Sequence, residues 1–477
     1  MIHETRVFIG NEWVAPADGS TFPTVDPATE EVIADVALAG PQDIDRAVRA
    51  ASDAMMGEWG SMPPERRAEL IARLGEVIAA HAEEIAELET RDMGKPIRES
   101  RTNIVRSVRT FQYYAGAVDK LLGDTIPIGN AGLAFTLYEP VGATAHITPW
   151  NYPFANACRS LPIALAAGCT AVIKPASVTP LTTLMLGDMV LEAGLPAGVV
   201  NIVTGDGRKT GASLAGHPGI RAITFTGSVE TGRRIARAAA ERIVPSVLEL
   251  GGKNPQIVFA DADFDLAIAQ TMRGALTNAG QVCTSVSRVL VERSLASDFV
   301  AALDAKISAL RIGPGMEDVD IGPLVSSDHR ETVEHYVRSG VDEGGRLVAG
   351  GERPKEFDRG YFFKPALFDR VTPDMAIATE EIFGPVLSVI AFNSEDEALA
   401  IANGLTLGLT AGVFTRDIAR AMRFVRRLEA GMVWVNDWFL SPVQVPHGGV
   451  KESGLGREQG MNALLNYVHV KSIGIRT

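Results

Sequence analysis

The sequence predicts an α/β protein built around a doubly wound parallel sheet. Four short apolar segments have the character of strands, and each ends in a turn that leads into a helix-like segment: 141–148, 170–174, 199–204 and 222–226. Successive units of this kind form parallel sheets covered by helices. Ligands of such sheets bind beyond the carboxyl ends of the strands, so we expect a binding site at these four turns.

The region before these strands, residues 41–118, is predicted to be helical. Prolines open two amphipathic segments, at Pro41 and at Pro63-Pro64, and apolar residues then recur near helical spacing. The sequence Gly94-Lys95-Pro96 is a stop signal.

A second mixed region is expected between residues 252 and 450. Its predicted strands are 256–259, 287–291, 386–391 and 431–435. Two further segments, 133–139 and 467–475, are predicted to be strands outside both sheets. Such strands either pair with another subunit or form a local edge, and the pattern leaves both open.

The composition indicates a globular protein of two or three domains. The chain has 477 residues, 46% of them hydrophobic and 22% charged. Its net charge of −13 argues against nucleic acid or an anionic membrane surface as a partner. No export signal is visible, and the longest apolar stretch, 161–173, is too short to span a bilayer. We therefore expect a cytoplasmic protein.

The cysteine pattern argues against disulfides and against a metal centre. The three cysteines, Cys158, Cys169 and Cys283, are an odd number without CxxC spacing. Cys283 follows Gly280, and a glycine there would let the backbone approach a substrate closely. Such a cysteine is either buried packing or a nucleophile, because a thiolate attacks carbonyl carbon readily.

Two polar residues stand at predicted strand ends. Glu249 closes an apolar run and precedes Gly251-Gly252, so its carboxylate could point into a cleft. Partial burial would raise its pKa and suit it to general-base catalysis. Asn151 lies between Trp150 and Tyr152 after the first strand, where its amide could donate to a developing oxyanion. A solvated strand end and an aromatic turn are the structural alternatives.

Three other motifs suit a nucleotide, although each is weak alone. Lys174 ends a strand and could bind hydroxyl or phosphate groups. Gly227 and Gly232 span a turn that opens a helix, a position that suits a pyrophosphate, although the motif is not GxGxxG. In Glu380-Glu381-Ile382-Phe383, a carboxylate could bind ribose and an aromatic ring could pack on nicotinamide.

In this order, the motifs resemble the aldehyde dehydrogenase superfamily over essentially the whole chain, to the glycine-rich segment 448–454. The resemblance implies a Rossmann-like cofactor domain, an α/β catalytic domain and a small β oligomerisation arm, in a homodimer or homotetramer. The implied boundaries are 1–120 and 141–251 for the NAD(P)-binding domain, 252–450 for the catalytic domain, and 121–140 and 451–477 for the arm.

The resemblance also implies a role for each site residue. Cys283 would attack the aldehyde, Asn151 and the Cys283 N–H would hold the oxyanion, and Glu249 would activate water to hydrolyse the thioester. A glutamate at this place favours hydrolysis over transfer to coenzyme A. The implied cofactor contacts are Trp150, Lys174, Ser177, Gly227, Ser228, Gly232, Glu381 and Phe383. The implied substrate contacts are Tyr152, Arg159, Thr284 and Trp438.

Two departures from the family pattern bear on specificity. Many members have glutamate where this chain has Ser177, and losing that charge should let NADP as well as NAD bind. Arg159 is similar to succinate-semialdehyde dehydrogenases, where it would bind a distal carboxylate. The alternative is a structural arginine on the predicted helix 154–167, paired with an acid. Trp438 and Phe439 would equally suit an aromatic or betaine-type aldehyde. A catalytically silent protein of the same fold is the alternative from another class.

Overall fold

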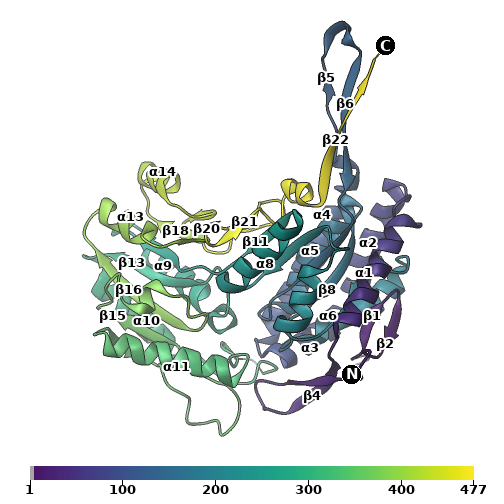
Figure 1. The fold of residues 1–477 in the computed structure, drawn as a ribbon. Helices are drawn as coiled ribbons and strands as arrows, with labels where there is room; N and C mark the ends of the chain where they lie inside the picture. The colour runs from purple at the N-terminus through teal and green to yellow at the C-terminus, as the bar shows by residue number, and fades with distance from the viewer. Residues whose placement is uncertain (1–4, 318, 477) are drawn as a thin grey trace.

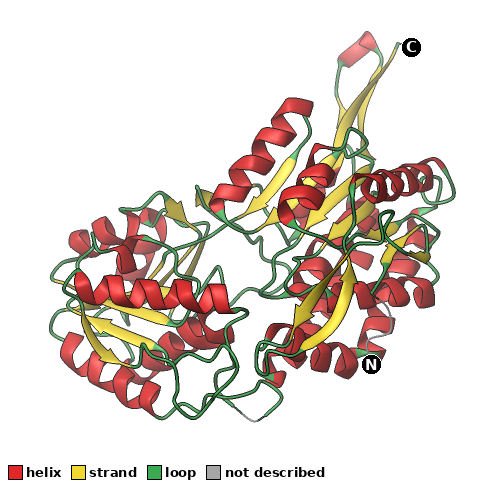
Figure 2. Cartoon of the chain, turned by 60° about the horizontal axis from the view of Figure 1, so that its bottom comes forward, coloured by secondary structure: helices red, strands yellow, loops and turns green. Residues whose placement is uncertain are grey.

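The computed structural model describes residues 5–317 and 319–476. Figure 1 shows two lobes that each contain a sheet, with a strand arm projecting from the N-terminal lobe. The predicted α/β class is therefore confirmed. Figure 2 shows helices packed around the strands of both lobes.

The sheet of the N-terminal lobe has eight strands in the order β2-β1-β9-β8-β7-β10-β11-β21. The central five, from β9 to β11, are parallel, as predicted. Because β8 and β10 flank β7 on opposite sides, the strand order reverses between β7 and β10, which is where such sheets bind ligands. The bounds are β1 Val7–Ile9, β2 Glu12–Val14, β7 Ala143–Ile147, β8 Thr170–Lys174, β9 Val200–Ile202, β10 Ala222–Thr226, β11 Ser246–Glu249 and β21 Gly454–Leu455.

Strand periodicity explains how helices cover both faces of this sheet. On β8, Ala171 and Ile173 pack into one buried cluster and Val172 into another, because successive side chains of a strand point to opposite faces. The helices are α1 Pro41–Met56, α2 Pro64–Ala80, α3 Ala82–Met93, α4 Ile97–Ala115, α5 Pro153–Ala167, α6 Leu181–Ala193, α7 Ala212–Gly216 and α8 Val229–Arg242.

The predicted helix starts at Pro41 and Pro64 and the stop at Gly94 are confirmed, but the segment predicted to run unbroken through Glu89 is two helices that meet at His81. Proline occupies the first position of α1, α2 and α5, where its missing N–H costs nothing. Helix α3 ends at Met93 because Gly94 adopts the left-handed conformation, with φ of 94°.

The sheet of the second lobe has seven strands in the order β14-β15-β16-β13-β12-β18-β19, parallel except for β14. All four strands predicted here are present. The strands are β12 Asn254–Val258, β13 Val286–Glu292, β14 Arg346–Ala349, β15 Ala366–Asp369, β16 Val386–Phe392, β18 Thr410–Phe414 and β19 Met432–Val435. The helices are α9 Phe264–Leu276, α10 Ala296–Ser308, α11 Ser327–Asp342, α12 Ala376–Thr379, α13 Glu395–Asn403 and α14 Ile418–Arg427.

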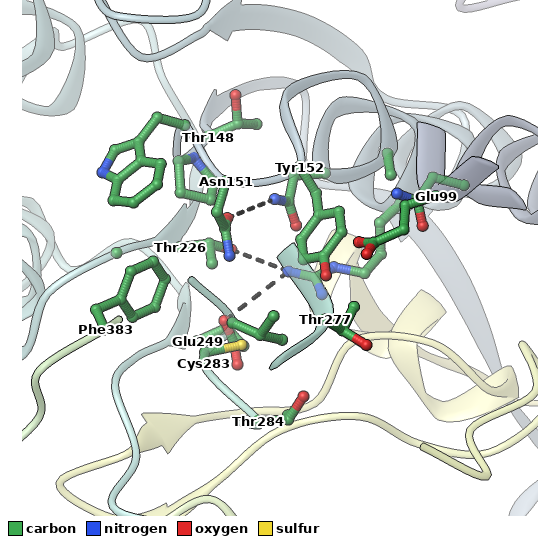
Figure 3. Close-up of a pocket in the computed structure, with 18 of the residues that line it drawn as sticks. Glu99, Thr148, Asn151, Tyr152, Thr226, Glu249, Thr277, Cys283, Thr284 and Phe383 are labelled. Carbon is green, nitrogen blue, oxygen red and sulfur yellow. Dashed lines mark hydrogen bonds and ion pairs between the residues drawn. The ribbon is translucent and has the colours of Figure 1, made fainter. Parts of the chain in front are cut away.

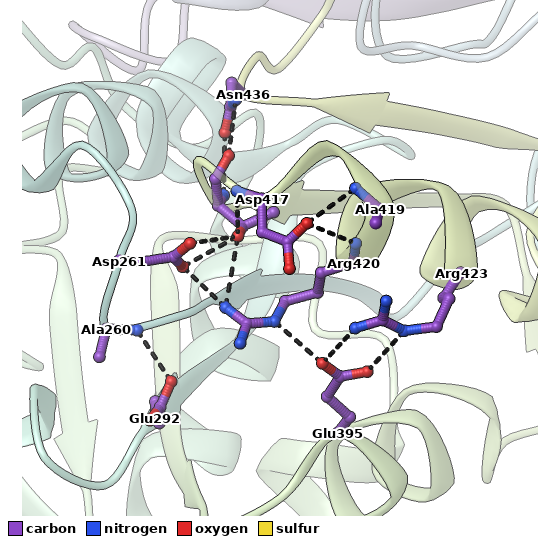
Figure 4. Close-up of polar contacts among 10 residues, drawn as sticks. Ala260, Asp261, Glu292, Glu395, Asp417, Ala419, Arg420, Arg423 and Asn436 are labelled. Carbon is purple, nitrogen blue, oxygen red and sulfur yellow. Dashed lines mark hydrogen bonds and ion pairs between the residues drawn. The ribbon is translucent and has the colours of Figure 1, made fainter.

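An arginine network fastens α14 and α13 to this sheet (Figure 4). Arg420 donates to Asp261 at 2.8 Å and to Glu395 at 2.9 Å, and its guanidinium lies 4.4 Å from the centre of the Phe259 ring. Arg423 donates to the same Glu395. Several charges acting together stabilise more than isolated surface pairs do. The network therefore holds α13 and α14 against the sheet, at a place in the lobe that is remote from the site.

The arm is a three-stranded antiparallel sheet of β5 Thr125–Ile126, β6 Leu133–Pro140 and β22 Val468–Ile475. The two strands predicted to lie outside both sheets therefore pair with each other, along eight positions. β22 is an edge strand within the described chain. The C-terminal segment does not lie wholly in the arm, because β21 hydrogen-bonds to β11 in the first sheet. The remaining strands are β3 Thr21–Val25, β4 Val32–Ala37, β17 Leu407–Gly408 and β20 Val450–Lys451.

Among the described residues, no helix has both the length and the apolar character needed to cross a membrane.

Candidate active site

A cavity of about 1710 Å³ is lined by residues of both lobes. Its wall in the first lobe is formed where β7, β8, β10 and β11 end, with Thr148, Lys174, Thr226 and Glu249 among the lining residues. The cavity lies at three of the four predicted strand ends, those of β7, β8 and β10, and at the end of β11 in place of the predicted segment 199–204. All three residues implied for the chemistry, Cys283, Glu249 and Asn151, line this cavity.

Cys283 lies in the irregular segment between α9 and β13. Asn278, Ala279 and Gly280 all have positive φ, so the chain turns sharply after the helix. A Cβ on Gly280 would lie 2.5 Å from the Gly384 carbonyl oxygen, so the residue must be glycine. The Cys283 thiol is unpaired and partly exposed. Burial, followed by the nearby Glu249 carboxylate, raises its pKa, so the resting group is a neutral thiol.

The Asn151 side chain is fixed beside this segment. Its amide nitrogen donates to the Gln281 carbonyl oxygen at 2.9 Å, and its oxygen accepts from Asn156 at 3.4 Å. Asn278 donates to the Asn151 carbonyl oxygen at 3.0 Å. Among the described residues, one of the two Asn151 amide hydrogens has an acceptor, and the side chain lies on the same side of the pocket as Cys283 and Glu249 (Figure 3). A donor is therefore available next to the thiol.

Glu249 is the last residue of β11 and is 1% exposed. Burial alone would disfavour its ionised form, but His447 and Arg159 outweigh it and hold the pKa of Glu249 below its ordinary value. His447 Nε2 lies 3.6 Å from one carboxylate oxygen, and Arg159 Nη2 lies 3.9 Å from the other. The expected raised pKa is therefore wrong in direction, because the His447 side chain and the Arg159 guanidinium lie against a buried carboxylate.

Arg159 is engaged with protein groups. On α5, its Nε lies 2.5 Å from the buried Glu458 carboxylate, and Nη2 donates to Thr226 at 3.2 Å. Its side chain is 14% exposed. The structural alternative, an arginine paired with an acid, is the arrangement found. Arg159 borders the cavity, but its guanidinium is already paired, so the structure gives no support to a clamp for a substrate carboxylate.

Replacing Arg159 by alanine is expected to lower the free energy of unfolding by about 3–5 kcal/mol, because Glu458 is left buried without a counter-charge. The kcat/KM for succinate semialdehyde and for butanal should fall by similar factors, since Arg159 supports Glu249 instead of holding substrate. Thermal melting and steady-state rates measure both effects.

The double variant Arg159→Met with Glu458→Gln is the control, and should recover part of the lost stability because no unpaired charge remains. A loss of kcat/KM confined to succinate semialdehyde would instead support the hypothesis that Arg159 binds a substrate carboxylate.

Most of the residues implied for the cofactor line one side of the cavity. Phe383 lies on the side of Cys283 opposite Tyr152 and Glu99 (Figure 3), and its ring centre is 5.1 Å from that of Trp150. Glu381 accepts a hydrogen bond from the Gly252 N–H at 3.1 Å, and burial raises the pKa of Glu381 to about 7. The cofactor candidates lining this cavity are Trp150, Lys174, Ser177, Gly227, Ser228, Glu381 and Phe383.

The structure places two predicted contacts away from the cavity lining. Gly232 lies inside α8, where a Cβ would lie 2.5 Å from the Leu250 side chain, so it allows α8 to pack against the end of β11. Trp438 is fully buried, and its Nε1 donates to the Thr284 carbonyl oxygen at 2.9 Å. Its neighbours Trp434 and Phe439 face the cavity instead.

Tyr152 and Thr284, the predicted substrate contacts, line the cavity together with Glu99. Glu99 and His447 were not anticipated. Glu99 accepts from the Asn278 N–H at 2.9 Å, and burial raises its pKa to about 7. A signal for His447 existed, because it directly precedes the glycine-rich segment that carries part of the family resemblance.

Comparisons with known proteins agree with this geometry. Residues 13–473 match the family described as the aldehyde dehydrogenase family. The chain is 42% identical over 470 residues, 98% of its length and 93% of the relative, to the hydroxyisobutyraldehyde dehydrogenase of Mycolicibacterium austroafricanum. It is 44% identical, with a TM-score of 0.98, to an NAD⁺ complex of aldehyde dehydrogenase from Bacillus cereus, covering 99% of this chain and 97% of that one. It is 38% identical, with a TM-score of 0.97, to betaine aldehyde dehydrogenase from Staphylococcus aureus in complex with NAD⁺, covering 98% and 94%. The family resemblance predicted from the motifs is confirmed, and the chain belongs to the aldehyde dehydrogenase family.

Proposed function

We propose that this protein oxidises a small aldehyde to a carboxylic acid with NAD or NADP, through a thioester on Cys283 that water hydrolyses. The observation that carries the proposal is the convergence of a thiol, a buried carboxylate and a fixed amide in one cavity: Cys283, Glu249 and Asn151. These are the nucleophile, base and oxyanion donor that acyl chemistry needs.

In the proposed reaction, Glu249 takes the thiol proton as Cys283 Sγ attacks the carbonyl carbon of the aldehyde. The amide of Asn151 and the Cys283 N–H donate to the oxyanion. A dinucleotide held by Lys174, Glu381 and Phe383 would supply the hydride acceptor for this carbon, which would leave the acyl group on Cys283 as a thioester. Glu249 releases the thiol proton to solvent and then removes a proton from the water that attacks the thioester. As the acid leaves, Glu249 passes this second proton to the Cys283 sulfur. The overall change consumes aldehyde, oxidised cofactor and water, and yields acid, reduced cofactor and a proton.

The cofactor side of the cavity suits a dinucleotide. Lys174 is 3% exposed, and its Nζ has one acceptor among the described residues, the Pro175 carbonyl oxygen at 2.8 Å, of the three it could use. Its remaining donors can bind ribose hydroxyls. A Cβ on Gly251 would lie 1.9 Å from Glu381 Oε2, so the backbone there must be glycine to leave room for this carboxylate. Ser228 caps α8, whose N-terminus favours an anionic group such as pyrophosphate.

Ser177 is proposed to allow NADP as well as NAD. The Ser177→Glu variant is expected to lose about 10-fold or more of its kcat/KM for NADP, or ~1.4 kcal/mol, because the new carboxylate repels the 2′-phosphate. Its kcat/KM for NAD should change little. Ser177→Gln is the neutral control of equal size, and steady-state titrations of both cofactors give the result. No turnover with NADP in the unaltered protein would contradict the proposal.

The substrate is proposed to be a small aldehyde. The names of two relatives supply candidates, hydroxyisobutyraldehyde and betaine aldehyde. The main argument for a carboxylated semialdehyde as substrate was a free Arg159 guanidinium, but Arg159 is paired with Glu458. Trp434, Phe439 and Val443 give the substrate side an apolar wall, while Tyr152 and Thr284 add polar groups. An apolar or a small hydroxylated aldehyde fits this mixture.

The test is reduced nicotinamide absorbance over a panel of succinate semialdehyde, hydroxyisobutyraldehyde, betaine aldehyde, benzaldehyde and hexanal, each with NAD and NADP. Formation of reduced cofactor and the matching acid supports the proposal. Absence of reduced cofactor with every aldehyde would favour the catalytically silent alternative.

We also infer that the arm joins copies of the chain into a homodimer or homotetramer. The edge strand β22 and the exposed side chains of Leu133, Leu137, Val470 and Ile475 support this inference, because unpaired apolar edges are usually covered.

A further inference from the structure

Three different metal-binding groups meet beside the nucleophile. The Cys283 sulfur, a Glu249 oxygen and a His447 nitrogen all lie within 4.8 Å of one another. Two of these groups belong to the proposed reaction, but His447 has no step in it. Thiolate, imidazole and carboxylate are the ligands that zinc takes in proteins.

These groups have unmet bonding capacity. Within the described residues, the two Glu249 oxygens and the His447 Nε2 have no partner at hydrogen-bond distance, and their contacts are the longer ion pairs of 3.6 Å with each other and 3.9 Å with Arg159. Glu249 is 1% exposed and the His447 side chain 12%. Buried polar atoms are nearly always partnered, so this cluster has open positions for a ligand that accepts electron pairs.

The spacing is close to that of a tetrahedral site. Zinc binds sulfur at about 2.3 Å and nitrogen or oxygen at about 2.0 Å, so tetrahedral ligand atoms lie about 3.3–3.6 Å apart. His447 Nε2 and Glu249 Oε1 are already 3.6 Å apart. The Cys283 sulfur lies within 4.8 Å of both, and all three residues line the cavity.

The backbone holds His447 in this place. Its N–H donates to the Glu458 carbonyl oxygen at 2.6 Å, and the Glu458 N–H donates back at 2.8 Å. Glu249 is likewise fixed at the end of β11. Two of the three ligands are therefore preorganised, which lowers the entropic cost of binding a metal.

The local charges also balance. Arg159 lies 3.9 Å from Glu249 but is paired with Glu458, so these two charges cancel. The Glu249 carboxylate and a Cys283 thiolate then supply two negative charges, which match one Zn²⁺ ion. The charge of a Zn²⁺ ion bound here would be neutralised by these two ligands alone.

We propose that Cys283, Glu249 and His447 form a zinc site that reversibly switches the enzyme off. Zinc replaces the thiol proton: the S–H bond breaks, the proton passes to water, and an S–Zn bond forms without any redox change. The sulfur is then unable to attack an aldehyde. The proposal goes beyond the dehydrogenase reaction, and the binding step requires neither aldehyde nor dinucleotide.

The test measures metal binding to the intact protein without substrate or cofactor. Zinc chloride competing with a chromophoric chelator is expected to show one zinc per chain. Cobalt(II) in its place should give thiolate-to-metal charge-transfer absorption. Zinc should also slow alkylation of Cys283 by iodoacetamide, and a chelator should reverse this protection.

His447→Phe is expected to weaken zinc binding by about 100-fold or more, since one ligand is lost. His335→Phe, an exposed position on α11, is the matched control and should bind zinc like the unaltered protein. His447→Asn, with thermal melting of each variant, separates ligand loss from misfolding.

Unchanged zinc affinity in both folded His447 variants would overturn the proposal, as would cobalt binding without the thiolate band. Because binding is measured apart from turnover, failure of this proposal and failure of the dehydrogenase proposal are distinguishable.

Discussion

Cys283→Ser is expected to lower kcat for aldehyde oxidation by about 10⁴-fold or more, the loss typical of a removed nucleophile. A hydroxyl is far harder to deprotonate than a thiol and is a weaker nucleophile toward carbonyl carbon. Binding of the dinucleotide, measured by protein fluorescence, should remain because the cofactor candidates are untouched.

Cys169→Ser is the matched control. Cys169 is fully buried, and its sulfur donates to the Tyr467 carbonyl oxygen at 3.1 Å, a contact that a hydroxyl can keep. Its activity should stay close to that of the unaltered protein. Cys158 is also fully buried and cannot reach a substrate. Substantial oxidation by the Cys283→Ser variant would therefore mean that the proposed thioester is wrong.

Glu249→Gln is expected to lower kcat by about 10²–10⁴-fold, the usual contribution of a general base. The amide keeps the size of the side chain but cannot take a proton from water. If some acylation persists through the small ionised fraction of Cys283, hydrolysis becomes limiting and the thioester accumulates. Rapid mixing should then show up to one reduced cofactor per site, and intact-protein mass should show the added acyl group.

The pH dependence follows from the lowered pKa of Glu249. A carboxylate whose pKa lies below its ordinary value of 4.5 stays ionised above that pH and is lost as a base only as the pH falls through the lowered value. Hydrolysis of the thioester should therefore not lose this base between neutral pH and about pH 5. His447→Phe should move that loss toward higher pH, because the side-chain contact from His447 that lowers the pKa of Glu249 is gone. A thioester that hydrolyses normally in the Glu249→Gln variant would contradict the role of Glu249.

The features that the sequence predicted correctly depend on local patterns. The ends of β7, β8 and β11 follow from apolar runs that stop at a turn or a charged residue, so the sequence alone places Asn151, Lys174 and Glu249 on one edge of the sheet. Proline and glycine signals likewise located the starts and ends of helices. Such signals act over a few neighbouring residues and survive in the folded chain.

The features that were missed depend on long-range contacts. Arg159 pairs with Glu458, and His447 approaches Glu249, across segments that only the completed fold brings together. These contacts reversed the expected pKa shift of Glu249. Asn436 and Phe439 have positive φ, so the alternation of side chains breaks there and Trp438 points into the core. No periodic pattern predicts the direction of a side chain beside such turns.

The pairing of β21 with β11 makes the order of synthesis relevant to activity. The strand that ends in Glu249 gains its edge partner only from Gly454–Leu455, and the Leu250 N–H donates to the Ser453 carbonyl oxygen at 3.0 Å. Arg159 likewise gains its counter-charge only from Glu458. These residues are synthesised after Cys283, and contacts between distant segments form late in folding. A nascent or C-terminally cleaved chain therefore contains Cys283 but lacks the contacts that hold Glu249 in place. Such incomplete molecules would carry the nucleophilic thiol but could not complete the proposed reaction.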